Sequence, residues 1–326
     1  RPGSPKVRCF LRMREDAMMD RQITRHIAMV RPCSFYFNAD TAANDFFQKN
    51  LGEKRDIVEA KALIEFDGFV AKLRSKGINV HVIQDDASVF ETPDSIFPNN
   101  WFVSLEGDKL VLCPMFAEDR RPERIKFLGA LVEGMGRDQL KIYDYTKHEK
   151  EGRFLEGTGA MVLDRANKKA YCCLSQRADE GLFRQFCNDF GFKAVPFHGF
   201  QSYRGQRVAI YHTNVMMAIG EKYAVVCLDA IDDPDERKLV VDELTESGKE
   251  IIAVSESEID NFAGNEIEVL GDDDKLYTVM THSTFNVLTD DQKAAIEKSS
   301  EILVGDVQTI EAYGGGSVRC MISEIF

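Results

Sequence analysis

The sequence lacks several features that would place it in common classes of protein. Its 326 residues carry 41 Lys and Arg against 54 Asp and Glu, a net charge of −13, so it lacks the basic excess on which phosphate binding depends. No stretch approaches the roughly 20 apolar residues that span a bilayer, and the N-terminus lacks the apolar core of a signal peptide. We therefore expect no nucleic-acid partner, no membrane contact and a cytoplasmic location.

Patterns typical of metal binding are also missing. The eight cysteines include no Cys-x-x-Cys pair, which fits a reducing compartment and argues against a structural zinc site. No His-rich or mixed His/carboxylate cluster has the spacing of metal ligands. The acidic runs Asp232–Glu236 and Asp272–Asp274 lack the spacing of a calcium loop. We predict neither a metal nor a cofactor.

What the chain does have is a helix-then-strand order that recurs five times. Its size, with 44% hydrophobic and 29% charged residues, is that of an ordinary globular protein with one large domain or two small ones. Each segment combines helical apolar spacing with a following short strand. The five segments are 56–83, 122–145, 177–197, 234–254 and 290–307.

Hairpins separate these segments, each made of two apolar runs around a polar turn. A fifth hairpin would pair the C-terminal run 318–325 with an N-terminal strand at 24–31. The other four are predicted at 101–114, 160–174, 215–228 and 267–280.

The spacing of these hairpins predicts the fold. Their starts at Asn100, Gly157, His212 and Asn265 are 57, 55 and 53 residues apart, which indicates an internal ββαβ repeat. We expect an α/β fold in which five ββαβ units close into a five-bladed propeller with pseudo-fivefold symmetry. Equivalent strand starts would then converge at one end of the axis, where their side chains can share a site.

Residues 1–22 have no helical or strand period and contain a Pro/Gly-rich start. We interpret them as a flexible leader, a mis-called start or residues added for expression. Residues 23–326 are predicted to form a single catalytic domain.

Cys320 is the first candidate for chemistry. It follows Gly314–Gly316, whose glycines let the backbone approach a ligand, and a thiol becomes a nucleophile when a nearby base or cation favours its thiolate. The alternative is a buried structural cysteine. That alternative fits most of the other cysteines, which lie in apolar strands or helix faces.

His212 and Glu156 are the next candidates. Period-2 alternation would put His212 and Asn214 on one face of a strand mouth, where an acid/base and an amide can share a ligand. Glu156 precedes a strongly apolar strand, and a buried carboxylate needs a partner; it could orient His212 or bind a cationic substrate. The alternatives are a hydrogen-bonded turn for His212 and a solvated loop for Glu156.

Two further polar positions lie at element ends. Asn99 and Asn100 follow Pro98, so they are either turn formers or substrate ligands. Arg177 could bind a substrate carboxylate through two hydrogen bonds, or it could cap the start of a helix.

Together these residues resemble the guanidine-modifying pentein superfamily. This superfamily includes arginine deiminase, dimethylarginine dimethylaminohydrolase, arginine–glycine amidinotransferase and succinylarginine dihydrolase. The resemblance covers residues 23–326. It is carried by Phe97–Asn100, Leu155–Gly157, Ser175–Arg177, His212–Asn214 and the glycine-rich approach to Cys320.

The resemblance implies a role for each candidate. Cys320 would attack the central carbon of a guanidinium to form a covalent adduct, and His212 would be the general acid/base. Glu156 would orient His212 and bind the substrate, and Arg177 would lie near the substrate or its lid.

The chain departs from the deiminase pattern at two positions, because the expected aspartates fall on Asn100 and Asn214. A carboxylate only accepts hydrogen bonds, whereas an Asn amide also donates. Donors suit the neutral ureido oxygen of citrulline and the oxyanion formed on attack. We predict hydrolysis of citrulline to ornithine, ammonia and carbon dioxide, without turnover of arginine.

Other functions remain open from the sequence. The same chemistry could act on arginine, a methylarginine or an acylated arginine, or could transfer an amidino group to an acceptor amine. A ring of this kind could also be a non-catalytic binding protein, since fold does not fix function. In the enzyme case the partner is a small-molecule substrate, and a homodimer is possible.

Overall fold

The computed structural model describes residues 21–42, 45 and 47–326. This part of the chain has an α/β fold with five three-stranded sheets and one two-stranded sheet. Each three-stranded sheet joins an antiparallel pair to a third, parallel strand. In sheet order the strands are β17 (Ser323–Glu324), β1 (His26–Arg31) and β2 (Asn79–Gln84); β3 (Phe102–Leu105), β4 (Lys109–Leu112) and β5 (Lys141–Asp144); β6 (Met161–Asp164), β7 (Lys169–Cys173) and β8 (Lys193–Phe197); β11 (Met217–Ile219), β12 (Tyr223–Val226) and β13 (Glu250–Ala253); β14 (Ile267–Leu270), β15 (Leu276–Thr281) and β16 (Glu301–Gly305).

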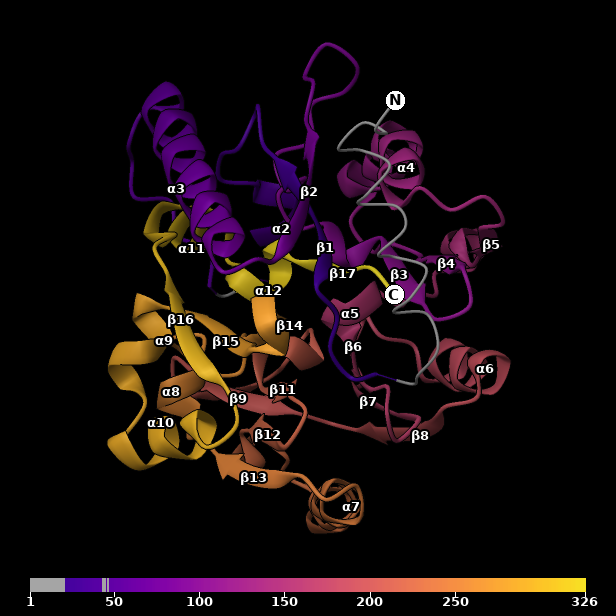
Figure 1. Cartoon of the computed structure of the whole chain (residues 1–326), viewed down its shortest axis with the longest axis vertical. Coiled ribbons are helices and arrows are strands. Elements are labelled where there is room, and N and C mark those ends of the chain that lie inside the picture. Colours follow the sequence, from indigo (N-terminus) through magenta and orange to yellow (C-terminus); the bar gives the residue numbers. More distant parts are fainter. Residues whose placement is uncertain (1–20, 43–44, 46) are drawn as a thin grey trace.

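One helix precedes the parallel strand of each sheet, as the sequence predicted. Figure 1 shows these helices on the outside of the molecule, with shorter elements in the middle. Two of the predicted starts are confirmed: the Asp233 side chain accepts hydrogen bonds from two backbone N–H groups, and Thr289 forms a capping box with Gln292. No helix in the described part of the chain is long and apolar enough to cross a membrane. The five helices are α3 (Arg55–Ser75), α4 (Pro122–Met135), α6 (Glu180–Phe190), α7 (Pro234–Glu246) and α10 (Asp290–Glu297).

The hairpin mouths differ from the prediction, because several are short helices and not extended strands. Residues Thr213–Val215 form a 3₁₀ turn, so the period-2 argument that placed His212 and Asn214 on one strand face was wrong. Thr213 holds this turn through its hydroxyl, which donates to the carbonyl of Ala160 and accepts the N–H of Cys173. The Thr213 hydroxyl thereby gives hydrogen-bond partners to two buried backbone groups.

The C-terminal run was also predicted as one strand over 318–325, and this was wrong for its first half. Residues Val318–Met321 form helix α12, and only β17 is extended. The predicted pairing of the two chain ends is nevertheless present, because β17 runs antiparallel to β1 with Ile27 opposite Glu324.

The structure also contains short elements that the prediction did not place as helices or strands. They are the hairpin β9 (Phe200–Tyr203) and β10 (Gln206–Ala209), the short helices α2 (Ala39–Ala42), α5 (Gly157–Ala160), α8 (Glu256–Ile259), α9 (His282–Val287) and α11 (Gln308–Gly314), and the 3₁₀ turns at Pro98–Asn100, Glu118–Arg120, Thr146–Glu151, Leu228–Ala230 and Asp272–Asp274.

The first strands of neighbouring sheets lie against one another in the middle of the molecule. β17 contacts β3, and β11 contacts both β6 and β14. The apolar core lies between these sheets and the outer helices, and it includes the fully buried Trp101, Tyr171 and Phe183. Packing of this kind brings the starts of the first strands together, and with them the short helices α5 and α12.

Residues 1–20 of the predicted leader lie outside the described residues. The last residue of the leader, Gln22, is only 6% exposed. Its amide nitrogen donates to the carbonyl of Leu163 at 2.9 Å, and its amide oxygen accepts the N–H of Arg165 at 2.6 Å. Gln22 therefore ties the chain to the turn after β6.

We expect Gln22→Ala to lower the free energy of unfolding by about 1–3 kcal/mol, because it leaves the N–H of Arg165 and the carbonyl of Leu163 buried without that partner. Urea denaturation would measure the change, with the exposed Gln139→Ala as control. Equal stability of the two variants would contradict this role for Gln22.

Candidate active site

Cys320 lies on α12, buried at 9% exposure, with its sulfur between two amides. Asn265 donates to Sγ at 3.3 Å and Asn214 at 3.5 Å. Space at this point is short, since a Cβ on Gly316 would lie 2.8 Å from the Phe97 ring and 3.1 Å from Cβ of Cys320. Close packing against Phe97 and Cys320 therefore requires a glycine at position 316, a reason different from the approach to a ligand that the sequence suggested.

The protonation of this thiol depends on two opposing effects. Burial raises the pKa of Cys320, while hydrogen bonds from Asn265 and Asn214 and the charge of Arg319 lower it, and burial prevails. The free protein thus holds a protonated thiol at neutral pH. Asn265 had been noted only as a repeat start, and its contact with the sulfur was missed.

His212 and Glu156 form a buried pair. Nε2 of His212 lies 2.6 Å from Oε2 of Glu156, and the other carboxylate oxygen accepts the N–H of Phe116 at 2.8 Å. Burial raises the pKa of Glu156, but the charge of Arg177 and the bond to His212 outweigh it and bring the pKa to about 2. Burial lowers the pKa of His212 despite Glu156. The pair is therefore a carboxylate holding a neutral imidazole in a fixed orientation.

Asn100 lies beside this pair. Its Oδ1 accepts a hydrogen bond of 2.6 Å from Nη1 of Arg120, and its Nδ2 has no partner among the described residues. Gly159 leaves room for it, since a Cβ there would lie 2.3 Å from Asn100 Nδ2 and 3.0 Å from His212 Nδ1. Because a buried donor normally has a hydrogen-bond partner, Nδ2 of Asn100 can donate to a ligand bound in this site.

Arg177 connects several parts of the site. Its guanidinium lies 4.7 Å from the centre of the Tyr211 ring, donates to the carbonyl of Thr41 at 3.3 Å and lies 3.7 Å from Glu156. Arg177 is only 4% exposed. The arginine therefore neutralises Glu156 and holds the segment of Thr41 against the site.

Two carboxylates of the site were missed by the sequence reading. Asp94 accepts hydrogen bonds from Asn38 and Thr41 on Oδ2, while its Oδ1 is buried without a partner among the described residues. Burial raises the pKa of Asp45 to about 6, although the charge of Arg177 lowers it. Neither aspartate lies on a helix or strand with a regular apolar pattern, so no sequence signal marked them. Only the folded structure places Asp94 beside Phe97 and Asp45 beside Gly315.

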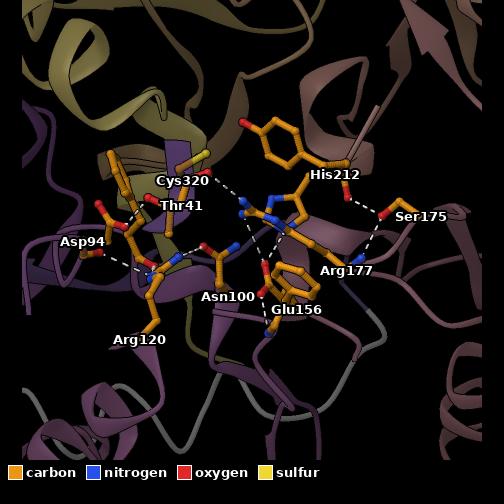
Figure 2. Close-up of polar contacts among 12 residues, drawn as sticks. Thr41, Asp94, Asn100, Arg120, Glu156, Ser175, Arg177, His212 and Cys320 are labelled. Carbon is orange, nitrogen blue, oxygen red and sulfur yellow. Dashed lines mark hydrogen bonds and ion pairs between the residues drawn. The ribbon is translucent and has the colours of Figure 1, made fainter. Parts of the chain in front are cut away.

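Figure 2 shows five of the six predicted residues close together, and the sixth, Asn214, contacts the sulfur of Cys320. One small cavity is lined by Cys320, His212, Asn100 and Arg177, together with Asp94, Asp45 and Arg120. Glu156 lies behind His212, and Asn214 lies at the sulfur. A thiol, a neutral imidazole, amide donors and carboxylates around one cavity can support nucleophilic attack on a carbon bonded to nitrogen.

The family of the chain follows from a model that matches it over residues 31–326, that of eukaryotic N,N-dimethylarginine dimethylhydrolase. The chain belongs to this family. It is thus a member of the pentein superfamily of guanidino-modifying enzymes, as its motifs suggested. No curated protein sequence matched the chain.

Several solved structures of other proteins share the α/β fold of this chain. ArgZ, an arginine dihydrolase from the ornithine–ammonia cycle in cyanobacteria, superposes with a TM-score of 0.70 at 15% identity; the match covers 92% of this chain and 41% of ArgZ. Against the N-terminal domain of ArgZ bound to substrate, it covers 91% and 96%. AgrE with L-arginine superposes with a TM-score of 0.70 at 17% identity, and the match covers 92% of this chain and 40% of AgrE. Dimethylarginine dimethylaminohydrolase with S-methyl-L-thiocitrulline superposes with a TM-score of 0.62 at 14% identity, and the match covers 92% of this chain and 99% of that protein. The chain thus spans about two fifths of full-length ArgZ and AgrE.

Asn265→Ala should move the alkylation of Cys320 to higher pH, because the thiolate loses the hydrogen bond that lowers the pKa of this thiol. The rate of iodoacetamide labelling of Cys320, followed by peptide mass spectrometry from pH 7 to 10.5, measures the shift. The control is Asn261→Ala, which removes an exposed amide four residues away. If the pH dependence of the labelling rate were the same in Asn265→Ala and the wild-type protein, Asn265 would not lower the pKa of Cys320.

Glu156→Gln should remove a pH-dependent part of the stability of this family member. The pKa of Glu156 lies near 2 in the folded protein against an ordinary 4.5, so as pH falls the unfolded chain binds the proton first. The carboxylate therefore contributes about 3 kcal/mol above pH 4.5, and this contribution disappears as pH falls toward 2.

Urea unfolding of the wild-type protein and Glu156→Gln at several pH values checks this. The stability difference should be large at pH 7 and should shrink below pH 4.5. The exposed Glu133→Gln serves as control. A difference that is constant with pH would show that Glu156 is not held ionised.

Proposed function

We propose that this protein is a cysteine-dependent hydrolase that cleaves C–N bonds of the ureido group of citrulline, giving ornithine, ammonia and carbon dioxide. The observation that carries the proposal is the shared cavity of Cys320 and His212, with Glu156 behind the imidazole at 2.6 Å. A buried base oriented by a carboxylate next to a thiol is the arrangement that nucleophilic hydrolysis requires. Membership of a guanidino-hydrolysing family supports the reaction type.

The residues divide the steps among them. His212 takes the thiol proton, and Sγ of Cys320 attacks the ureido carbon to form a C–S bond. His212 then gives a proton to the departing nitrogen as one C–N bond breaks. Water activated by His212 cleaves the C–S bond, and the resulting carbamate breaks down to carbon dioxide and the second amine.

The amides favour an oxygen-bearing substrate. Nδ2 of Asn100 is an unpaired donor, and Nδ2 of Asn214 already contacts the sulfur. Attack of the thiolate places negative charge on the ureido oxygen, and a preorganised donor there contributes roughly 3–4 kcal/mol in known enzymes. Arg177 lines the cavity, and its guanidinium is our candidate to bind the carboxylate of the substrate amino acid through two hydrogen bonds.

Arginine is a second candidate substrate, and one observation favours it. Oδ1 of Asp94 is buried at the cavity without a partner among the described residues, and such a carboxylate suits the N–H groups of a guanidinium. ArgZ is described as an arginine dihydrolase. Under this alternative the same cysteine would first convert arginine to citrulline and then hydrolyse the citrulline.

We also infer that the five sheets close into the predicted five-bladed propeller, with residues 23–326 as one catalytic domain. The contacts β17–β3, β6–β11 and β11–β14 link neighbouring first strands, and α5 and α12 bridge toward β3 and β15. Cytoplasmic location and a homodimer remain predictions.

The test is release of ammonia and ornithine from citrulline and from arginine by the purified protein. We expect turnover of citrulline, and Cys320→Ala should lower it by at least about 10³-fold because the nucleophile is lost. Cys33→Ala, which changes a thiol outside the cavity, should retain the activity.

The other outcomes separate the alternatives. Arginine turnover that depends on Cys320 would favour the dihydrolase alternative, and appearance of an amidino product with added glycine would favour transfer over hydrolysis. An intact, folded protein without turnover of either amino acid would overturn the proposed function.

A further inference from the structure

A second cavity lies where the strands β6, β11 and β14 meet in the middle of the molecule (Figure 1). Thr158 on α5, Arg319 on α12 and Gln22 near the start of the described chain also line it. It shares no lining residue with the cavity of Cys320. Its volume of about 30 Å³ has room for one or two species of the size of water, because one such species needs about 10–15 Å³.

Two glutamates two positions apart line this second cavity. Glu266, directly before β14, is 1% exposed, and neither of its carboxylate oxygens has a hydrogen-bond partner among the described residues. Glu268, on β14, accepts the N–H of Glu221 at 2.6 Å on one oxygen, and its other oxygen has no partner in the described part of the chain. Buried acceptors normally have partners. Three such atoms beside one cavity suit a ligand that donates hydrogen bonds or carries positive charge.

The arginine that lines the second cavity is bonded to a different carboxylate. Arg319 donates to Glu324 at 2.9 Å, and Arg165 lies 3.8 Å from the same carboxylate. Three carboxylates, those of Glu266, Glu268 and Glu324, therefore line the cavity against the one guanidinium of Arg319. The lining carries an excess of negative charge.

This excess is concentrated on Glu266. Burial, and then the charge of Glu268, raise the pKa of Glu266 to about 8. Lys249 lowers the pKa of Glu268, but its ammonium group donates to the carbonyls of Gly220 and Glu221 at 2.9 and 3.0 Å. A buried carboxylate is costly unless a cation accompanies it. The ionised form of Glu266 therefore favours a cation in the space beside it.

We propose that the second cavity is a binding site for one small monovalent cation, ammonium or potassium, held by the carboxylates of Glu266 and Glu268. Both ions are close to water in size, which matches the volume of the cavity. Ammonium would donate hydrogen bonds to the three acceptor atoms, and potassium would take the same atoms as oxygen ligands. Calcium prefers 6–8 oxygen ligands, and the guanidinium of Arg319 at the cavity disfavours a doubly charged ion.

Thermal unfolding of the full chain at pH 8.5, where Glu266 is mostly ionised, tests the proposal. Melting is followed by circular dichroism in about 0.2 M ammonium, potassium or tetramethylammonium chloride, the last having a cation too large for the cavity. A cation that binds only the folded protein raises Tm. We expect ammonium or potassium to give a Tm about 2–4 °C above that in tetramethylammonium, the shift for a site at about ten times its Kd. Glu266→Gln, which keeps the shape and removes the charge, should abolish this difference.

The chain offers a matched control in Glu311, another buried glutamate at 4% exposure. Ser317 and Ser283 each donate to one of its carboxylate oxygens at 2.7 Å, and it does not line the second cavity. Glu311→Gln should therefore keep the difference in Tm between the salts, whatever its own stability.

Each other result has one meaning. Equal Tm values of the wild-type protein in the three salts would overturn the proposal, and so would a difference that persists in Glu266→Gln. A shift in one of the two small cations alone supports the site and identifies its ion. If Glu266→Gln does not fold, Glu268→Gln takes its place with the same expected loss. The measurement needs no turnover, so its outcome does not depend on the proposed function.

Discussion

The structure of the site depends on keeping ionised groups charged where water is nearly absent. Glu156, Arg177 and Arg120 are each at most 4% exposed. An isolated charge at such depth would lose its proton or gain one, so each needs a partner of opposite sign. Glu156 lies between His212 and Arg177, and Arg120 is paired with Glu123. The pairs keep the charges in place, and the charges in turn fix the orientation of the groups that would meet a substrate.

Orientation is the chief product of this network. Glu156 fixes the ring of His212 through Nε2, which leaves Nδ1 facing the space beside Gly159. Arg120 fixes the amide of Asn100 in the same way, and its donor is directed to the same side. Two of the residues that line the cavity, His212 and Asn100, are therefore oriented by charged partners, Glu156 and Arg120.

Local signals in the sequence were sufficient for the outer helices, and for part of the site. Asp233 and Thr289 cap helices with hydrogen bonds to residues three positions or fewer away, so their effect is readable from a short window. Cys320, His212 and Glu156 were identified as candidates because each lies at a hairpin mouth of the repeat. Asp94, Asp45, Asn265 and Arg120 could not be found in this way. Each reaches the site through contacts between segments that only the folded chain brings together, such as Asn265 with Cys320, 55 residues apart.

The cavity therefore contains two chemically different polar groups, and only one of them was identified from the sequence. Asn100, backed by Arg120, presents a donor, whereas Asp94 presents an unpaired carboxylate oxygen. A donor and an acceptor in one cavity can serve a ureido group, which has an oxygen that accepts hydrogen bonds and N–H groups that donate them. A guanidinium satisfies the carboxylate but not the amide donor. On the proposed function, the presence of both a donor and an acceptor is thus the feature by which the two substrates would be distinguished, and the hydrogen bond from Arg120 determines which end of the Asn100 amide is the free donor.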